Sequence, residues 1–264
     1  MTTGYDHIAR YYDLSHDHLT ADIPFLLAQA EKTDDPFLEL GCGSGRLLVP
    51  LARAGYRVTG VDNSTEMLAR AEMRLASEAP TVRDRVELVM ADMTTLTSLD
   101  EAGPFGLAFF GYNTFMHLDE TAAARAIQRI RPLLRDGGLV LLDLDNPLTL
   151  ASAADEPDFV LEEVLEDKTT GEIISQYTAY ETVPGEQAVT VTWIYEIVAS
   201  GQDLSRRFKL RQNYHYLYPH QIELLLNLVG FRLQGLYGDY DGSPYDEESD
   251  RMLVVASTVT TSNP

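Results

Sequence analysis

Three glycines at alternating positions follow a short apolar run near residue 40. The segment FLELGCGSG (residues 37–45) reads as a strand that carries Glu39, then a tight turn with Gly41, Gly43 and Gly45, after which LLVPLARAG continues with helical spacing. Glycine accepts a positive φ and lets a ligand approach the backbone closely, and the free N–H groups that open a helix suit a polar or anionic group. The pattern is typical of a nucleotide-binding corner.

The spacing of these glycines separates two kinds of nucleotide site. The dinucleotide fingerprint G-x-G-x-x-G requires glycine at position 46, where the chain has Arg46. The turn therefore fits a ligand without a pyrophosphate better, which argues against an NAD-dependent oxidoreductase.

An acidic residue ends the next strand. Asp62 closes YRVTGVD, at an interval after Glu39 that suits one α/β crossover. A carboxylate at that place can accept hydrogen bonds from both ribose hydroxyls of an adenosine. We expect Asn63 and Glu66 to cap the following helix, and Met67 is either an adenine contact or a core residue.

The motif Glu39-x-Gly41-x-Gly43-x-Gly45, followed by Asp62, resembles the class I S-adenosylmethionine-dependent methyltransferases. The segment YDHIARYYD (residues 5–13) is similar to a prefix that forms a helical lid over the methyl donor in many small-molecule members. A tyrosine ring near a sulfonium gains cation–π attraction, and Tyr12 is the favoured candidate. An ordinary amphipathic helix with packed tyrosines explains the segment equally well.

The resemblance implies S-adenosylmethionine as cofactor and S-adenosylhomocysteine as product. It also implies that Asp92, at the end of RVELVMADM, bonds the adenine amino group and that the next backbone N–H, of Met93, bonds a ring nitrogen. A solvated aspartate at a strand end is the alternative for Asp92. The expected cofactor residues are Tyr12, Glu39, Gly41, Gly43, Arg46, Asp62, Asn63, Met67, Asp92, Met93 and Phe110.

Asn113 and His117 are the candidate catalytic residues. They follow the strand that ends at Phe110, and in a doubly wound sheet the loops after the strands face the ligand crevice. This loop is therefore expected to meet the transferred methyl group. His117 could act as a general base because its unperturbed pKa lies near the operating pH, and a purely structural histidine is the alternative.

Asp143, Asp145 and Asn146 end the fifth strand. Such oxygen-bearing side chains could hold a divalent cation, but no further ligands can be named, so we prefer substrate contact or strand-end capping and predict no metal site. Cys42 is the only cysteine, which leaves no intrachain disulfide and no Cys-based zinc site. We expect Cys42 to pack in the glycine turn rather than to act as a nucleophile.

The hydrophobic period changes to two after residue 158. Residues 158–218 predict four antiparallel strands with turns near Gly171, Gly185 and Gly201. In small-molecule methyltransferases an insertion at this place covers the substrate or forms a dimer, so we expect it to be a candidate homodimer surface. Its aromatic residues alternate and are expected to share one face of the sheet, which either lines an acceptor pocket or serves sheet packing alone. They are Tyr177, Trp193, Tyr195, Tyr214 and Tyr216.

The net charge of the chain limits the kinds of partner that it is expected to bind. Twenty basic against 41 acidic residues give a net charge of −21, which argues against nucleic acid because phosphate binding needs clustered Lys and Arg. We interpret the excess of acidic residues mainly as a solvated surface, and it favours an amine acceptor only slightly. No signal-type apolar run and no run of about 18 apolar residues is present, so no membrane association and a cytoplasmic location are expected.

These features predict one α/β domain over residues 1–264. As the resemblance implies, we expect a Rossmann-like seven-stranded sheet in the order 3-2-1-4-5-7-6, helices on both faces and an antiparallel β insertion. The parts are an N-terminal helical lid (1–30), the S-adenosylmethionine-binding core (37–147), the insertion (158–218), and the last helix with a C-terminal hairpin (219–258).

The predicted reaction is transfer of the sulfonium methyl group to a nitrogen or oxygen of a small-molecule acceptor by in-line displacement. The donor carries its own leaving group, so orientation in a dry pocket should supply most of the acceleration and proton removal should be secondary. The alternative is a non-catalytic regulatory protein that keeps the S-adenosylmethionine site. The sequence does not separate an amine from a hydroxyl acceptor.

Overall fold

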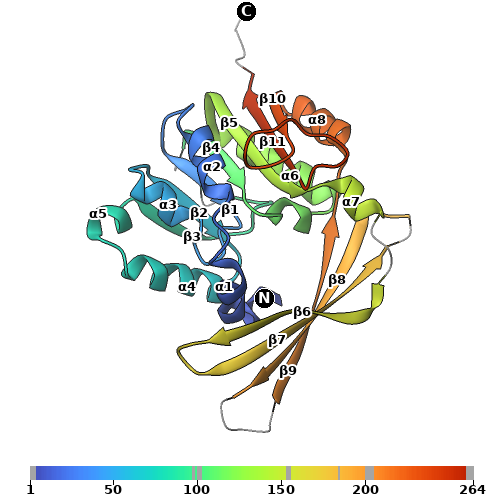
Figure 1. The fold of residues 1–264 in the computed structure, drawn as a ribbon. Coiled ribbons are helices and arrows are strands. Elements are labelled where there is room, and N and C mark those ends of the chain that lie inside the picture. Colours follow the sequence, from blue (N-terminus) through green and yellow to red (C-terminus); the bar gives the residue numbers. More distant parts are fainter. Residues whose placement is uncertain are drawn as a thin grey trace, which may run out of the picture.

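The computed structural model describes residues 4–96, 99, 103–152, 156–183, 185–199 and 205–259. Two sheets dominate the molecule. A seven-stranded sheet with helices on both sides forms the upper body in Figure 1, and a four-stranded antiparallel sheet projects below it.

The larger sheet has the strand order β10-β11-β5-β4-β1-β2-β3. Strand β11 runs antiparallel to both β10 and β5, and the remaining neighbours pair in parallel. Counted within this sheet, the order is the predicted 3-2-1-4-5-7-6, so the fold prediction is confirmed. The strands are β1 Phe37–Leu40, β2 Val58–Asp62, β3 Val86–Met90, β4 Phe105–Phe110, β5 Leu134–Asp145, β10 Phe231–Tyr237 and β11 Arg251–Thr258.

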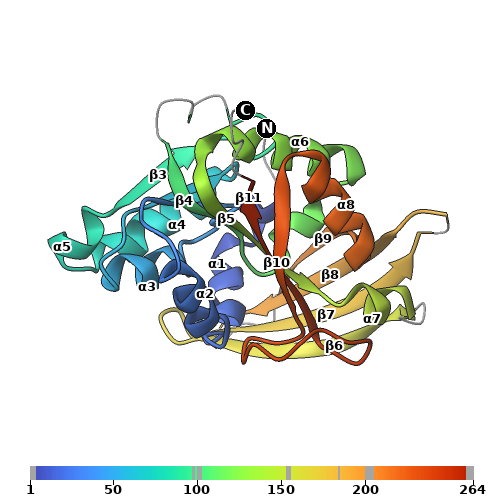
Figure 2. The ribbon, with the colours of Figure 1, turned by 90° about the horizontal axis from the view of Figure 1, so that it is seen from above.

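All four residues of β1 are buried, as expected for a central parallel strand covered on both faces. Leu38 and Leu40 belong to a core with α6 (Glu120–Ile130) and α8 (Pro219–Leu228). Phe37 instead belongs to a second core, whose helices are α2 (Asp22–Ala30), α3 (Leu48–Arg53) and α4 (Thr65–Ala76). Figure 2, seen from above, shows the two helical layers on opposite sides of the sheet.

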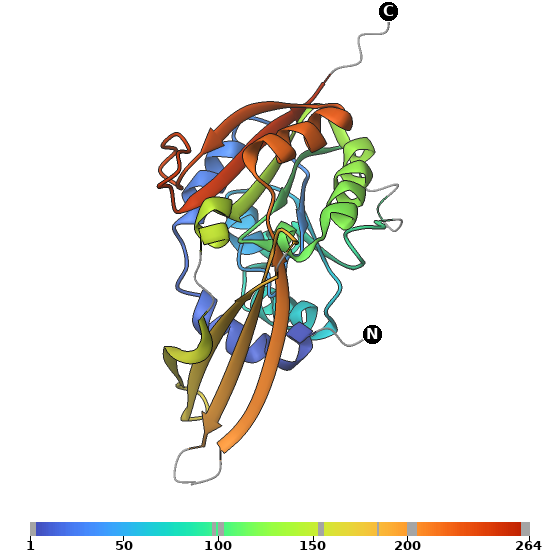
Figure 3. The same cartoon turned by 90° about the vertical axis from the view of Figure 1, so that its right-hand side faces the viewer.

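The remaining helices are short. The N-terminal pair, η1 (Gly4–His7) and α1 (Ala9–His16), lies between the two sheets, as Figure 3 shows from the side. The others are α5 Pro80–Arg83, η3 Thr114–His117, η4 Arg131–Leu133 and α7 Pro147–Ser152.

The smaller sheet is the predicted antiparallel insertion. Its strands pair in sequence order, and Gly171 has a φ of +71° in the turn between the first two. Gly185, with a φ of +81°, lies in the second turn, and the turn predicted near Gly201 lies outside the described residues. The strands are β6 Glu156–Asp167, β7 Glu172–Thr182, β8 Ala188–Val198 and β9 Ser205–His215.

Helix α1 packs between the small sheet and helix α4 of the larger sheet. Ile8 and Tyr11 share an apolar cluster with Ile174 and Leu210 of the small sheet. On the other side, the guanidinium groups of Arg70 and Arg74 in α4 form ion pairs with Asp13. Arg10 extends the connection to Asp167 and Glu172 of the insertion. The N-terminal segment is therefore held by apolar contacts and charge on both sides.

Two local predictions were wrong. Helix α4 is capped by Ser64, whose side chain accepts a hydrogen bond from Met67 N, and not by Asn63 with Glu66, because the helix begins one residue later than the pattern indicated. Tyr177 pairs with Ile194, the residue between Trp193 and Tyr195, and so lies on the opposite face of the insertion.

Candidate functional site

The glycine turn has the backbone geometry that its composition requires. Gly41, Gly43 and Gly45 all have positive φ, between +53° and +79°. A Cβ on Gly41 would lie 2.3 Å from Cγ2 of Thr114, so no larger residue fits there without displacing the loop after β4. The backbone N–H of Gly43 donates to Oδ2 of Asp62 at 2.8 Å, which joins the turn to the end of β2.

A cavity of about 370 Å³ opens at the carboxyl ends of the central strands, the usual ligand position in a doubly wound sheet. We call it the donor cavity. Its walls come from the N-terminal segment, the glycine turn, the ends of β2 and β3, the loop after β4 and strand β9. The lining residues are Tyr5, Tyr12, His16, Gly41, Gly43, Asp62, Asn63, Met67, Asp92, Met93, Thr94, Tyr112, Asn113, Thr114, His117, Leu118, Gln212 and Tyr214.

Two aspartates on the donor cavity are held by backbone and hydroxyl donors. Asp62 accepts from Ser64 N through Oδ1 at 2.8 Å, and burial raises its pKa while these backbone bonds oppose the rise. Asp92 accepts through Oδ1 from both the backbone N–H and the hydroxyl of Thr94, at 2.7 and 2.6 Å. Both carboxylates therefore have fixed orientations and keep further acceptor capacity.

Three of the expected cofactor residues do not line this cavity. Phe110 is fully buried and packs edge to face on Phe115. Arg46 binds both carboxylate oxygens of Asp22. Glu39 is buried with Oε2 unpartnered among the described residues, and burial raises its pKa well above the usual range. Its carboxyl group therefore keeps an oxygen that can still accept a hydrogen bond.

His117 lines the donor cavity, and both of its ring nitrogens lie near polar side chains. Its Nε2 is 3.1 Å from the hydroxyl of Tyr5, and its Nδ1 is 3.4 Å from Nε2 of Gln212. Burial lowers the pKa of His117 to about 4, so the ring is neutral at neutral pH and only weakly basic. The role of His117 as a general base stays a prediction.

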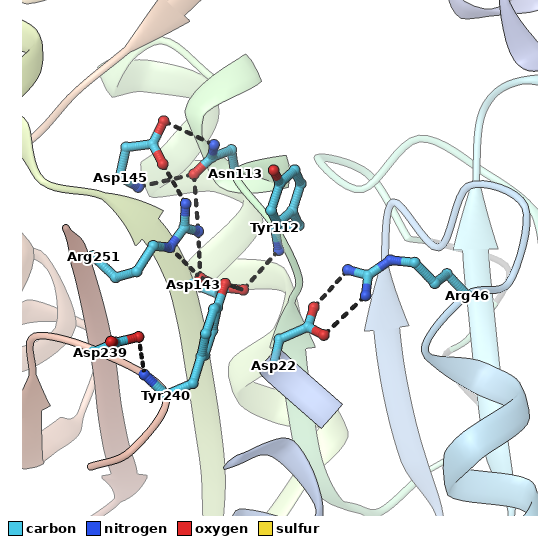
Figure 4. A network of polar contacts seen from close by, with 9 residues as sticks. All are labelled: Asp22, Arg46, Tyr112, Asn113, Asp143, Asp145, Asp239, Tyr240 and Arg251. Carbon is cyan, nitrogen blue, oxygen red and sulfur yellow. Dashed lines mark hydrogen bonds and ion pairs between the residues drawn. The ribbon is translucent and has the colours of Figure 1, made fainter. Parts of the chain in front are cut away.

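Asn113 is committed to a buried polar network, shown in Figure 4. Its Nδ2 donates to Asp145 at 2.9 Å, and its Oδ1 accepts from Asp145 N at 2.8 Å and from Arg251 at 3.1 Å. Arg251 also pairs with both Asp143 and Asp145. These bonds give the two aspartates a guanidinium partner.

Among the described residues, no group of three or more His, Cys, Asp or Glu side chains is arranged to hold a metal ion.

Tyr112 is the residue that this network supports and that the sequence reasoning missed. Its φ of +39° is unusual for a tyrosine, and its backbone N–H donates to Asp143 at 3.0 Å. The guanidiniums of Arg46 and Arg251 lie 5.6 and 5.3 Å from its ring centroid. A tyrosine followed by asparagine in an expected strand-to-helix loop was the only sequence signal, and it did not reveal these partners.

A second cavity, of about 440 Å³, adjoins the first and is called the acceptor cavity here. The two share six lining residues, namely Tyr5, Tyr12, His16, Tyr112, Asn113 and Tyr214. The inner face of the insertion closes the acceptor cavity with Trp193 and Tyr195, which is one of the two alternatives left open by the sequence, whereas Tyr216 packs against the main core. Further lining residues include Asp145, Glu162, Glu163, Gln176, Tyr180 and Val191.

Comparison with known proteins agrees with this geometry. Residues 37–138 match the family model of a methyltransferase domain. The chain is 29% identical to the cypemycin N-terminal methyltransferase of a Streptomyces species over 221 residues, which are 83% of this chain and 81% of that protein. The CcbJ methyltransferase of Streptomyces caelestis has a TM-score of 0.77 and 24% identity, over 98% of this chain and 99% of that one.

A second similar structure was solved with S-adenosylmethionine bound. The glycopeptide N-methyltransferase MtfA complexed with S-adenosylmethionine has a TM-score of 0.56 and 24% identity, over 98% of this chain and 95% of that one. The sheet order and the glycine turn agree with the match of residues 37–138 to a methyltransferase domain. The chain is similar to methyltransferases over most of its length, and S-adenosylmethionine is the cofactor that this likeness supports. No helix among the described residues is both long and apolar enough to cross a membrane.

Proposed function

We propose that the protein methylates an amine nitrogen of a small-molecule acceptor. The observation that carries this proposal is the pair of adjoining cavities. The acceptor cavity shares a wall with the donor cavity and is lined by Glu162 and Glu163, and by no lysine or arginine among the described residues. Such a lining favours a cationic or amine-bearing acceptor over an anionic one. Two relatives, the cypemycin and glycopeptide enzymes, are named as N-methyltransferases or N-terminal methyltransferases.

The donor cavity offers partners for each part of the cofactor. We assign the ribose hydroxyls to Asp62 and the adenine amino group to Asp92, because both carboxylates line the cavity with fixed orientation. Met67 packs beside the adenine. Glu39, with its unpartnered Oε2, suits the ammonium of the methionine part, which would also stabilise the charged carboxylate.

The remaining expected residues act less directly. Gly41 and Gly43 leave room for the cofactor, and the backbone of Met93 and the side chain of Asn63 complete the adenosine wall. Arg46 is assigned an indirect role, since it holds Asp22 and lies beside Tyr112. Phe110 has a packing role only. Residues 1–30 are proposed to act as a lid through Tyr5, Tyr12 and His16.

When bound, S-adenosylmethionine would supply a sulfonium methyl group whose carbon a neutral amine nitrogen can attack in line, so that the C–S bond breaks, S-adenosylhomocysteine leaves and the methylated ammonium loses its proton to solvent. The task of the chain is to hold that nitrogen against the methyl carbon in a water-poor space, which can supply much of the barrier reduction. Tyr5, Tyr112 and Tyr214 form the shared wall where the two cavities meet. We assign His117 to the positioning of Tyr5 through their 3.1 Å contact, and not to proton removal.

The test is a methyl-transfer assay with matched acceptor pairs. Each primary amine is paired with the alcohol of the same carbon skeleton, and formation of S-adenosylhomocysteine is measured with product identification by mass spectrometry. We expect amines to be methylated and the matching alcohols not. Methylation of the alcohols alone would contradict the nitrogen assignment, and donor binding without transfer to any acceptor would indicate a regulatory protein instead.

A further inference from the structure

We propose that the natural acceptor carries a second cationic group, which Glu162 and Glu163 bind away from the methylated nitrogen. This inference rests on the proposed amine methylation and adds the class of acceptor. It begins from the position of two consecutive glutamates on strand β6, both of which line the acceptor cavity.

Consecutive residues of a regular strand point to opposite faces of the sheet. Strand β6 breaks this rule at a register shift, where Leu161 pairs with Tyr177 and Glu163 pairs with Gln176, which leaves Glu162 as an extra residue. A bulge of this kind re-aims a side chain, and bulges are frequent beside active sites. Here the consequence is that both carboxylates line the same cavity.

Neighbouring donors fix both carboxylates. Glu162 accepts through Oε2 from Gln176 Nε2 at 2.9 Å and from the hydroxyl of Thr178. Both donors are buried, with 8% and 3% of Gln176 and Thr178 exposed. Glu163 accepts through Oε2 from the hydroxyl of Ser15 at 2.9 Å. The Oε1 atoms of both glutamates have no partner among the described residues, so each keeps one oxygen for a ligand.

A separate observation also indicates a ligand at this wall. Tyr195 is only 5% exposed, its ring stacks on Phe208 at 5.0 Å, and it lines the acceptor cavity. Its hydroxyl forms no hydrogen bond within the described part of the chain. Burial raises the pKa of Tyr195, and the nearby charges of Tyr5, Glu162 and Glu163 add to the rise. Because Tyr195 lines the cavity and its hydroxyl has no partner within the described part of the chain, that hydroxyl is available to the acceptor.

The location of the glutamates sets which part of the acceptor they bind. Tyr112 and Tyr214 line both cavities, whereas Glu162 and Glu163 line only the acceptor cavity. The group bound by the glutamates is therefore not the nitrogen at the methyl group. An ammonium or guanidinium compensates their charge, whereas a hydroxyl does not.

The experiment measures binding of simple amines to the protein saturated with S-adenosylhomocysteine. Calorimetric titrations compare the α,ω-diamines from 1,3-diaminopropane to 1,6-diaminohexane with the n-alkylamines of the same lengths. The variants are Glu162→Gln and Glu163→Gln combined, and Glu166→Gln as the control, because Glu166 is an exposed glutamate of the same strand outside the cavity.

We expect at least one diamine to bind the wild-type protein about tenfold more tightly than its alkylamine, as two charge-assisted contacts should provide. The double variant should reduce this preference to about twofold or less, and the Glu166 variant should keep it. The inference is overturned if no diamine binds more tightly than its alkylamine, or if the preference survives in the double variant. Failure of the amine proposal is distinguishable, because it would leave the diamine preference intact while no amine is methylated.

Discussion

Asp62 shows how one side chain serves both the backbone and a ligand. Its two oxygens accept from Gly43 N and Ser64 N, each at 2.8 Å, and the side chain also lines the donor cavity. The sequence indicated this residue because it ends the next strand along the chain after the glycine turn. The two backbone bonds could not be predicted, since they depend on how the turn folds over the end of β2.

The first prediction concerns donor affinity. Asp62→Asn keeps the size of the side chain and one acceptor oxygen but removes the charge that the ribose hydroxyls would bind. We expect binding of S-adenosylmethionine to weaken by about 1–3 kcal/mol, the range for a lost charged hydrogen bond. Calorimetric titration measures the effect, with urea unfolding as the control for a loosened turn. Unchanged affinity would remove Asp62 from the cofactor site.

The second prediction concerns His117 and pH. Its pKa is about 4 in the folded protein and near 6.5 when unfolded, so between these values the unfolded chain binds the extra proton and stability falls as pH falls. Below about pH 4 this contribution is fully lost, and above about pH 6.5 it is fully present.

His117→Gln removes this titration. Between pH 7 and pH 4.5 the wild-type protein should lose about 2 kcal/mol more unfolding free energy than the variant, since one pKa unit is worth about 1.4 kcal/mol. Urea unfolding at the two pH values measures the difference. Equal losses in both proteins would show that the pKa of His117 is not lowered.

At the scale of elements, the glycine turn was the most predictable part of the site. Its glycines have the positive φ angles that their residue type allows, and the strand before the turn and the helix after it were also predicted from the sequence. The loop after β4 was not predictable to the same extent. Its geometry at Tyr112 and Asn113 depends on Arg251, which lies on the last strand and is remote in the sequence.

The third prediction compares two glycines with the same backbone conformation. Gly41 has φ +69° and a Cβ there would contact Thr114, whereas Gly137 has φ +74° and open space around it. Each alanine substitution should cost about 1–2 kcal/mol through left-handed strain. Only Gly41→Ala should also displace the loop after β4 and weaken donor binding by about tenfold or more. Equal donor affinity in the two variants would contradict the close approach at Gly41.

The fourth prediction concerns helix α1 as a lid. Asp13→Asn removes the charge that pairs with Arg70 and Arg74, which hold α1 against α4. We expect S-adenosylhomocysteine to dissociate several times faster, as measured by stopped-flow displacement, with a stability loss of about 1–2 kcal/mol. The control is Glu78→Gln, which breaks the pair with Arg53 away from the cavities. Equal release rates would indicate that α1 does not control donor exchange.

At the scale of the whole molecule, two sheets enclose two adjoining cavities. The antiparallel insertion followed from the hydrophobic period, whereas the strand order of the large sheet was implied by the family resemblance. The sequence did not show which face of the insertion meets the core, because that face is decided by the bulge at Glu162 and by the register of β7 and β8. Tyr177 therefore fell on the wrong face in the prediction, while Trp193 and Tyr195 fell on the right one.

The most direct test of the account is a calorimetric titration of the wild-type protein with S-adenosylmethionine, S-adenosylhomocysteine and NAD. The glycine turn, Asp62 and Asp92 form one cavity that we assign to the methyl donor. We predict that the first two ligands bind with one site per chain and that NAD does not bind. Binding of NAD alone, or of none of the three, would contradict the assignment of the donor cavity and the function built on it.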